Sequence, residues 1–148
     1  MWCCHRCNQN KGNSFDTDNN RVVYDAEFED AIHTSATIYS LIEKPFMINP
    51  ELESVLKKLS FEDGIINSTD SRVRYTIDVC KLNRYDLTEK RLRILEDFVM
   101  KARKKNRLNK SYSDILDGLK RDFMNEKSEF RALKYWILIN HKVLVDEK

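Results

Sequence analysis

Apolar residues along this chain recur mainly at three- and four-residue steps, the spacing that places side chains on one face of an α-helix. The clearest stripe predicts a helix over about residues 87–105, and it consists of Leu92, Leu95, Phe98, Val99 and Ala102. Asp86 and Glu89 have the spacing of a capping box at the start of this helix. The same periodicity predicts helices over residues 113–123 and 128–140.

The first half of the chain contains weaker helical patterns. Phe28, Ile32, Tyr39 and Ile42 predict a helix over about 26–43, ended by Pro45. Asn49 and Pro50 form a helix start signal, and the apolar face that follows predicts a helix that ends at Gly64.

Three other segments have less regular patterns. Residues 72–80 alternate like a strand but also fit a helix, and we favour the helix because no second clear strand is present to pair with it. Residues 8–20 are polar and rich in turn formers, which predicts a loop or linker. Residues 141–145 fit a short strand or a tail.

Composition narrows the fold class. Of the 148 residues, 41% are hydrophobic and 34% are charged, so the chain holds enough apolar material for one modest core. Only three glycines and two prolines are present, whereas an all-β domain with many tight turns needs more of both. We therefore expect a mainly α protein, with a helical domain over 21–148 behind a short segment and linker at 1–20.

The net charge of +2 favours no particular partner, but it hides an uneven distribution. Residues 25–63 hold nine acids and three bases, whereas residues 101–110 hold six bases and no acid. The six bases are Lys101, Arg103, Lys104, Lys105, Arg107 and Lys110. They fit either a solvated helix end, where cations are favoured by the dipole, or a set of phosphate contacts in nucleic-acid binding.

No apolar run is long enough for a membrane span and no signal-peptide pattern opens the chain, so we expect a cytoplasmic protein without membrane contact.

The amino terminus carries the residues with the most distinctive chemistry. Cys4 and Cys7 have the C-x-x-C spacing that forms one half of a tetrahedral zinc site. The alternative is a group of thiols at a terminus that bind no metal.

The letters around this pair, C-x-x-C-N-x-x-K-G over 4–12, resemble the closing segment of HNH endonucleases, which have the ββα-metal fold. Later blocks resemble the region after that motif in one subgroup, the HNH proteins encoded beside ATPases in bacterial anti-phage systems, including Septu-type and certain retron systems. These blocks are PFMINP at 45–50, FEDGII at 61–66 and TIDVCKLNR at 76–84, followed by Leu87 and Arg91. The resemblance covers residues 2 to about 93.

By position, the resemblance implies that Cys4 and Cys7 are structural Zn²⁺ ligands and that Asn8 helps to hold a catalytic Mg²⁺ or Mn²⁺. Lys11 would lie near the scissile phosphate. The implied fold is a helical bundle preceded by a partial ββα-metal zinc-knuckle segment. The implied function is that of a DNA endonuclease component that acts on double-stranded DNA with an AAA- or ABC-like ATPase partner.

The family's general-base His and first zinc pair have no counterpart among the opening residues, and His5 lies between the two thiols. Because hydrolysis of a phosphodiester needs an activated water, we expect the site to be incomplete as written. Two other functions therefore stay open: a helical protein-interaction module without catalytic activity, and a nucleic-acid-binding domain that uses residues 101–110. The sequence leaves the oligomeric state open.

Overall fold

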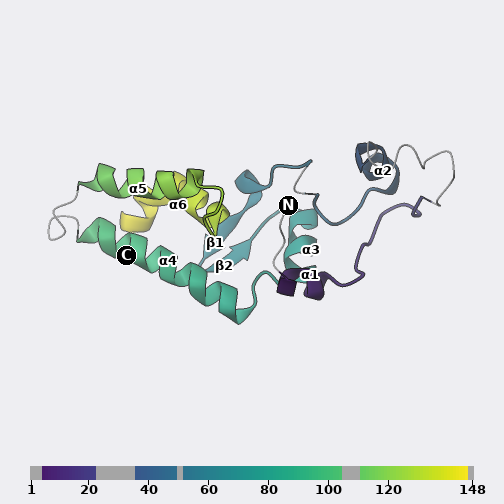
Figure 1. Ribbon diagram of the computed structural model, residues 1–148, viewed down its shortest axis with the longest axis horizontal. Coiled ribbons are helices and arrows are strands. Elements are labelled where there is room, and N and C mark those ends of the chain that lie inside the picture. Colours follow the sequence, from purple (N-terminus) through teal and green to yellow (C-terminus); the bar gives the residue numbers. More distant parts are fainter. Residues whose placement is uncertain (1–4, 23–35, 50–51, 105–110, 147–148) are drawn as a thin grey trace. The chain divides into compact units, whose positions relative to one another are not determined.

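The computed structural model describes residues 5–22, 36–49, 52–104 and 111–146 (Figure 1). The chain divides into two compact units. Unit 1 comprises Met1–Val55 and Thr69–Lys81, and unit 2 comprises Leu56–Ser68 and Leu82–Lys148. The sequence predicts a different division, with a helical domain over 21–148 that folds without residues 1–20. That division stays a prediction.

The described residues are mainly helical, which confirms the predicted mainly α class. The described residues of unit 1 form the helices α1 (His5–Lys11), α2 (Ala36–Glu43) and α3 (Ser71–Val79). The described residues of unit 2 form the 3₁₀ turn η2 (Leu56–Lys58), the strands β1 (Ser60–Glu62) and β2 (Ile65–Asn67), and the helices α4 (Tyr85–Arg103), α5 (Tyr112–Met124) and α6 (Arg131–Asp146). No helix among the described residues has both the length and the apolar character needed to cross a membrane.

The core of unit 2 is built from the apolar stripes of its helices. α6 packs against both α4 and α5, and the β1–β2 hairpin closes the core at one side. The buried residues of this core are Phe61, Leu95, Phe98, Ile115, Leu133 and Ile137. The predicted helix over 87–105 is thus confirmed as α4, and the two predicted carboxyl-terminal helices are confirmed as α5 and α6.

The ends of these helices differ from prediction in detail. Asp86 and Glu89 form no capping box; Arg84 is the N-cap, and its Nε lies 3.1 Å from the Asp86 carboxylate. The capping box is found instead on α5, where the Asp114 backbone N–H donates to the Ser111 hydroxyl at 3.1 Å. α6 continues to Asp146, so the predicted strand or tail at 141–145 is wrong.

The helix predicted between Asn49 and Gly64 is also wrong, because β1 and β2 form an antiparallel hairpin there. Asp63 and Gly64 connect the strands with φ of 46° and 81°, the left-handed pair that two-residue hairpin turns require. A side chain at Gly64 would collide with the Thr88 carbonyl of α4. Glycine is therefore required by both the turn and the packing.

Unit 1 is organised around α3. Asp70 caps the helix by accepting hydrogen bonds from the backbone N–H groups of Arg72 and Val73, at 3.0 and 3.1 Å. Its helical conformation confirms the helical alternative for residues 72–80. The buried apolar residues of unit 1 are Cys7, Ile48, Val73, Ile77 and Cys80.

Two other predictions are settled in part. α2 ends at Glu43, as predicted, whereas residues 26–35 of the predicted helix lie outside the described residues. The loop predicted over 8–20 is wrong for residues 8–11, because these residues form the second half of α1.

Arg91 is a charged side chain buried in unit 2, with an exposed fraction of 2%. Its guanidinium donates to the carbonyl oxygens of Leu87, at 3.0 Å, and of Leu82. Burial, followed by the nearby charge of Arg84, lowers the pKa of Arg91 to about 10. The side chain thus joins the start of α4 to the segment before it through backbone acceptors.

Candidate metal and nucleic-acid sites

Within the C-x-x-C-N-x-x-K-G segment, His5–Lys11 form the short helix α1. Cys7 is buried, with 7% exposed, whereas Asn8 is exposed and Lys11 is half-buried. Asn8 and Lys11 are three residues apart and so lie on neighbouring positions of the same helix face. Gly12, at φ 52°, ends the helix, and its N–H donates to the Asn8 carbonyl at 3.1 Å.

The metal ligands implied by the resemblance are present only in part among the described residues. Cys4 lies outside them, and the residues that the structure describes contain no group of three or more His, Cys, Asp or Glu side chains able to hold a metal ion. Cys7 therefore offers one sulfur and Asn8 one amide oxygen, which is fewer than a tetrahedral zinc or an octahedral magnesium site requires. The Zn²⁺ and Mg²⁺ or Mn²⁺ sites stay predictions.

The segment that follows α1 is attached to the rest of unit 1. The Tyr75 hydroxyl of α3 donates to the Asp16 carboxylate at 2.6 Å, and the Phe46 N–H donates to the Asp16 carbonyl at 2.9 Å. The hydrogen bond to the carboxylate, followed by burial, raises the pKa of Tyr75 above its usual value of 10.0. Thr17 and Pro45 pair as an isolated antiparallel bridge. α1 is thus followed by an anchored loop.

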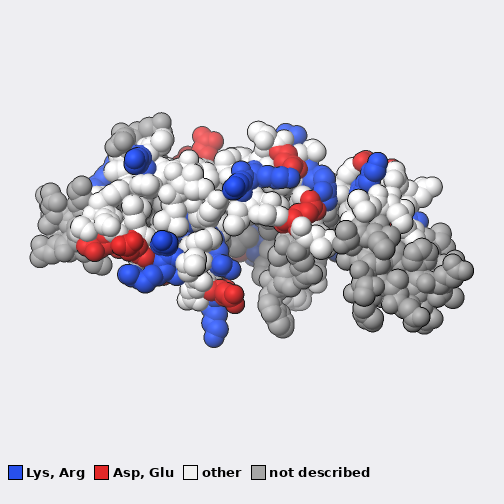
Figure 2. All heavy atoms as spheres, turned by 90° about the horizontal axis from the view of Figure 1, so that it is seen from above, with Lys and Arg blue, Asp and Glu red and all other residues white. Residues whose placement is uncertain are grey.

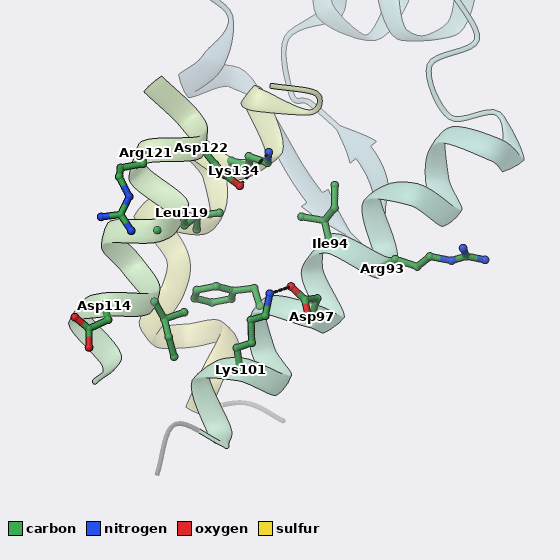
Figure 3. A pocket seen from close by; sticks show the side chains of 12 residues that line it. Arg93, Ile94, Asp97, Lys101, Asp114, Leu119, Arg121, Asp122 and Lys134 are labelled. Carbon is green, nitrogen blue, oxygen red and sulfur yellow. Dashed lines mark hydrogen bonds and ion pairs between the residues drawn. The ribbon is translucent and has the colours of Figure 1, made fainter. Parts of the chain in front are cut away.

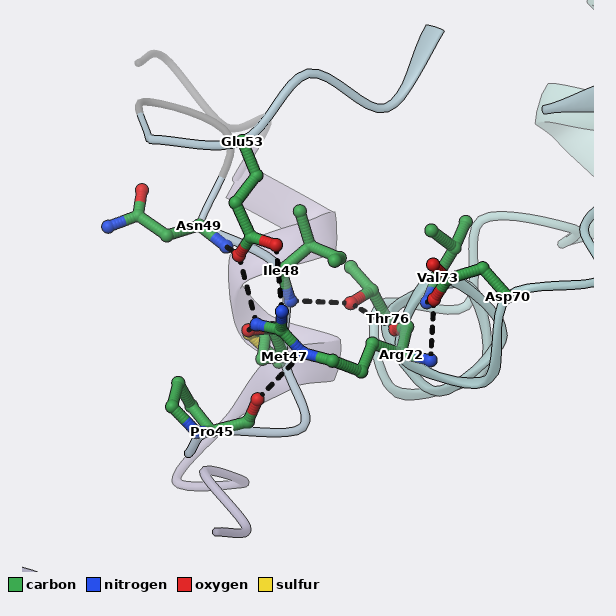
Figure 4. A network of polar contacts seen from close by, with 9 residues as sticks. All are labelled: Pro45, Met47, Ile48, Asn49, Glu53, Asp70, Arg72, Val73 and Thr76. Atoms are coloured by element: carbon green, nitrogen blue, oxygen red, sulfur yellow. Dashed lines mark hydrogen bonds and ion pairs between the residues drawn. The ribbon is translucent and has the colours of Figure 1, made fainter. Parts of the chain in front are cut away.

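A second polar network fixes the loop before β1 onto α3 (Figure 4). The Arg72 guanidinium makes a two-pronged pair with the Glu53 carboxylate, at 2.7 and 2.9 Å. It also donates to the carbonyls of Pro45, at 2.9 Å, and Met47, at 3.2 Å. The Ile48 N–H donates to the Thr76 hydroxyl at 3.0 Å. These contacts attach residues 45–48 and Glu53 to α3.

The basic run lies partly on the last turn of α4. Lys101 forms an ion pair with Asp97 at 2.6 Å, and Arg103 donates to the Val145 carbonyl at 3.4 Å. Lys104 is exposed. Lys105, Arg107 and Lys110 lie outside the described residues. Of the described part of the run, Lys104 is therefore the side chain best placed to contact a phosphate.

The surface charges are mixed. On the face in Figure 2, Lys and Arg side chains are interspersed with Asp and Glu side chains. This distribution agrees with the net charge of +2. A duplex bound to such a surface would be held by a few cations at particular positions.

The sequence patterns did not indicate a groove between α4 and α5, which has a volume of about 650 Å³ (Figure 3). Gly118 lies on this groove, in the interior of α5. A glycine within a helical pattern is unfavourable, and this is the one signal that could have drawn attention to the groove.

No model of a protein family, no curated protein and no solved structure matches this chain.

Proposed function

We propose that this chain is a DNA endonuclease component of the HNH type, which acts with an ATPase in bacterial anti-phage defence. The observation that carries the proposal is the form of α1. The residues that resemble the HNH closing segment form a helix that is ended by Gly12, with Cys7 buried and Asn8 exposed. A helix in this position agrees with the α element that gives the ββα-metal fold its name.

The exposure of Asn8 suits the role that the resemblance assigns to it. A ligand that helps to hold a cation between protein and DNA must be reachable from solvent, and the Asn8 side chain is exposed. A bound divalent cation would stabilise the charge that develops on the leaving oxygen. Lys11, on the neighbouring helix position, would attract the phosphate.

The base that activates water must come from a residue outside this pair. The amide of Asn8 and the ammonium of Lys11 are poor proton acceptors at neutral pH. His5 is exposed on α1, but it precedes Cys7 and lies between the two cysteines of the motif. We therefore expect the isolated chain to have little or no nuclease activity.

Chemical rescue tests the proposal. The chain is incubated with supercoiled plasmid and Mg²⁺ or Mn²⁺, with and without imidazole as a substitute for the missing His. We expect little nicking without imidazole and metal-dependent nicking with it, since imidazole in solution can accept the proton from water. Conversion of the plasmid to the open circular form is measured on gels.

Two variants of α1 make the test specific. Asn8→Ala should abolish the rescued nicking, whereas Gln9→Ala, an equally exposed neighbour on the same helix, should retain it. Equal nicking by both variants would contradict the HNH assignment. Robust nicking by the wild-type chain without imidazole would show that another residue acts as the base.

A further inference from the structure

The groove between α4 and α5 has an apolar floor. It is contained within unit 2 and has a volume of about 650 Å³. Its floor is formed by Ile94, Phe98, Ile115 and Leu119. Phe98 and Ile115 are buried, whereas Ile94 and Leu119 are half-buried, so apolar surface remains open to solvent along the groove.

Most of the charges around the groove are already neutralised within the chain. Lys101 pairs with Asp97 at 2.6 Å, and Lys134 lies 3.6 Å from Asp122. Asp114 accepts a hydrogen bond from the Ser111 N–H at 2.8 Å in the capping box of α5. The carboxylates at the groove are thus occupied by cations or by a helix cap.

Arg93 and Arg121 are different. Both are exposed, and neither guanidinium forms an ion pair or hydrogen bond with another side chain in the part of the chain that the structure describes. Figure 3 shows Arg93 on α4 and Arg121 on α5, on opposite sides of the groove and with both side chains directed outward from it. The groove therefore has an apolar floor and an unpaired cation on the outer side of each of its two helices.

Gly118 is an independent sign of an occupant. It lies in the interior of α5 without a positive φ, so nothing in the backbone requires glycine. A Cβ at this position would meet only the Arg121 Nη2, at 3.9 Å. Because glycine weakens a helix, its presence at an open position is unexplained by the fold. A missing side chain does allow another backbone to approach closely.

We propose that this groove binds an amphipathic α-helix of a partner chain, with acidic residues along both flanks. The apolar face of that helix would cover Phe98 and Leu119, and its backbone would pass over Gly118. Carboxylates on its two flanks would pair with Arg93 and Arg121. Nucleic acid fits the groove less well, because phosphates gain nothing from an apolar floor.

The probe is a fluorescein-labelled helical peptide with Leu at positions i, i+3, i+4 and i+7 and Glu on both flanks. Its twin carries Lys in place of each Glu, and a labelled DNA duplex is the third probe. Fluorescence anisotropy should show that the Glu peptide binds about tenfold or more tightly than the Lys peptide, and that its binding weakens with salt. Absence of Glu-peptide binding, or preference for the Lys peptide or the duplex, would overturn the proposal.

Matched charge reversals locate the contact. The double variant R93E/R121E should weaken binding of the Glu peptide by about tenfold or more. The control K90E/K120E makes the same charge change on the same two helices, at exposed positions that do not line the groove. It should leave the affinity within about twofold, because exposed charges away from the contact are screened. Equal losses in both variants would assign the binding to net charge alone.

Gly118→Leu separates binding from folding. Leucine is a strong helix former and the position is open, so the thermal midpoint of the variant should rise. The same side chain should fill the groove and weaken peptide binding by about tenfold or more. A lower midpoint would mean that Gly118 has a structural role, and unchanged binding would mean that the peptide docks elsewhere. Either result contradicts the proposed docking mode.

Discussion

Units 1 and 2 are held together by different kinds of contact. Unit 2 has a continuous apolar core in which Leu133 and Ile137 are 1% and 0% exposed. Among its described residues, unit 1 buries fewer and smaller apolar groups, and the loops that the structure describes there are fixed by polar contacts from α3. Arg72 holds Pro45, Met47 and Glu53, and Tyr75 holds the segment after α1.

This difference has consequences for stability. Apolar burial is not directional and grows with the area removed from water, so unit 2 gains stability along the whole length of its helices. Polar contacts stabilise one geometry and depend on individual atoms. Unit 2 should therefore be the more stable scaffold, and unit 1, which carries Asn8, should open at a lower free energy.

The largest effect is expected in the core of unit 2. Ile137→Ala removes three buried carbon atoms from a side chain with 0% exposure, and should lower the free energy of unfolding by about 3 to 4 kcal/mol. Ile139→Ala is the matched control, because Ile139 lies on the same helix and is 59% exposed. It should change stability by less than about 0.5 kcal/mol. Urea unfolding followed by circular dichroism gives both values, and equal losses would contradict the assigned core.

A smaller, local effect is expected at Arg72. Arg72→Ala removes the guanidinium that donates to Glu53 and to two backbone carbonyls, and should cost about 2 kcal/mol. This loss is smaller than that expected for a buried ion pair, because the Arg72 and Glu53 side chains are partly exposed. Hydrogen exchange should increase in α3 and in residues 45–49, and stay unchanged in α6.

Arg74→Ala is the control for this variant. Arg74 lies on the same helix and is exposed, so its loss should leave the exchange of α3 almost unchanged. If Arg72→Ala instead accelerated exchange throughout unit 2, the two units would unfold together, and unit 1 would not open at a lower free energy than unit 2.

The same difference explains what could be predicted from the sequence. The helices of unit 2 follow from their apolar periodicity, because burial of a periodic stripe determines both the conformation and the packing face. After Asn49 the cap and the apolar residues predict a helix, whereas in the structure Asp63 and Gly64 form a hairpin turn. Tertiary packing also requires glycine at this position, because a side chain at Gly64 would collide with α4.

The candidate site was predictable to a smaller extent. The spacing of Cys7, Asn8 and Lys11 was visible in the sequence, but the helix that carries them was expected to be mostly loop. The anchoring of Asp16 by Tyr75 joins residues that are 59 positions apart. Arg93 and Arg121 are also far apart in the sequence. They differ from Lys101 and Lys134 at the same groove because those two lysines lie close to Asp97 and Asp122, respectively. Contacts of this kind depend on tertiary structure and leave no periodic pattern.

Substitution of Lys11 in unit 1 and of Lys104 in unit 2 tests whether either unit contacts DNA, as the proposed function requires. Each phosphate contact that is lost should lower the slope of log K against log salt by about one unit and weaken binding equally on all sequences. We expect this result for both Lys11→Ala and Lys104→Ala, measured by salt-titrated anisotropy with a DNA duplex. Lys142→Ala, an exposed position on α6, is the control. An unchanged slope for Lys104→Ala would mean that the basic run is only a solvated helix end.

The smallest effect is expected at Tyr75, and it depends on pH. Tyr75→Phe removes the hydrogen bond to Asp16, which should cost about 0.5 kcal/mol at neutral pH because the contact is exposed. The pKa of Tyr75 is raised in the folded chain, so folding favours the protonated phenol. Its contribution to stability is therefore complete below a pH of about 10 and is lost as the pH rises through the higher folded-state pKa. The difference in unfolding free energy between wild type and Tyr75→Phe should therefore shrink in that range. Tyr85→Phe, at a tyrosine that is 80% exposed, is the control and should leave the unfolding free energy at neutral pH almost unchanged. A constant difference for Tyr75→Phe would mean that the hydroxyl does not stabilise unit 1 through Asp16.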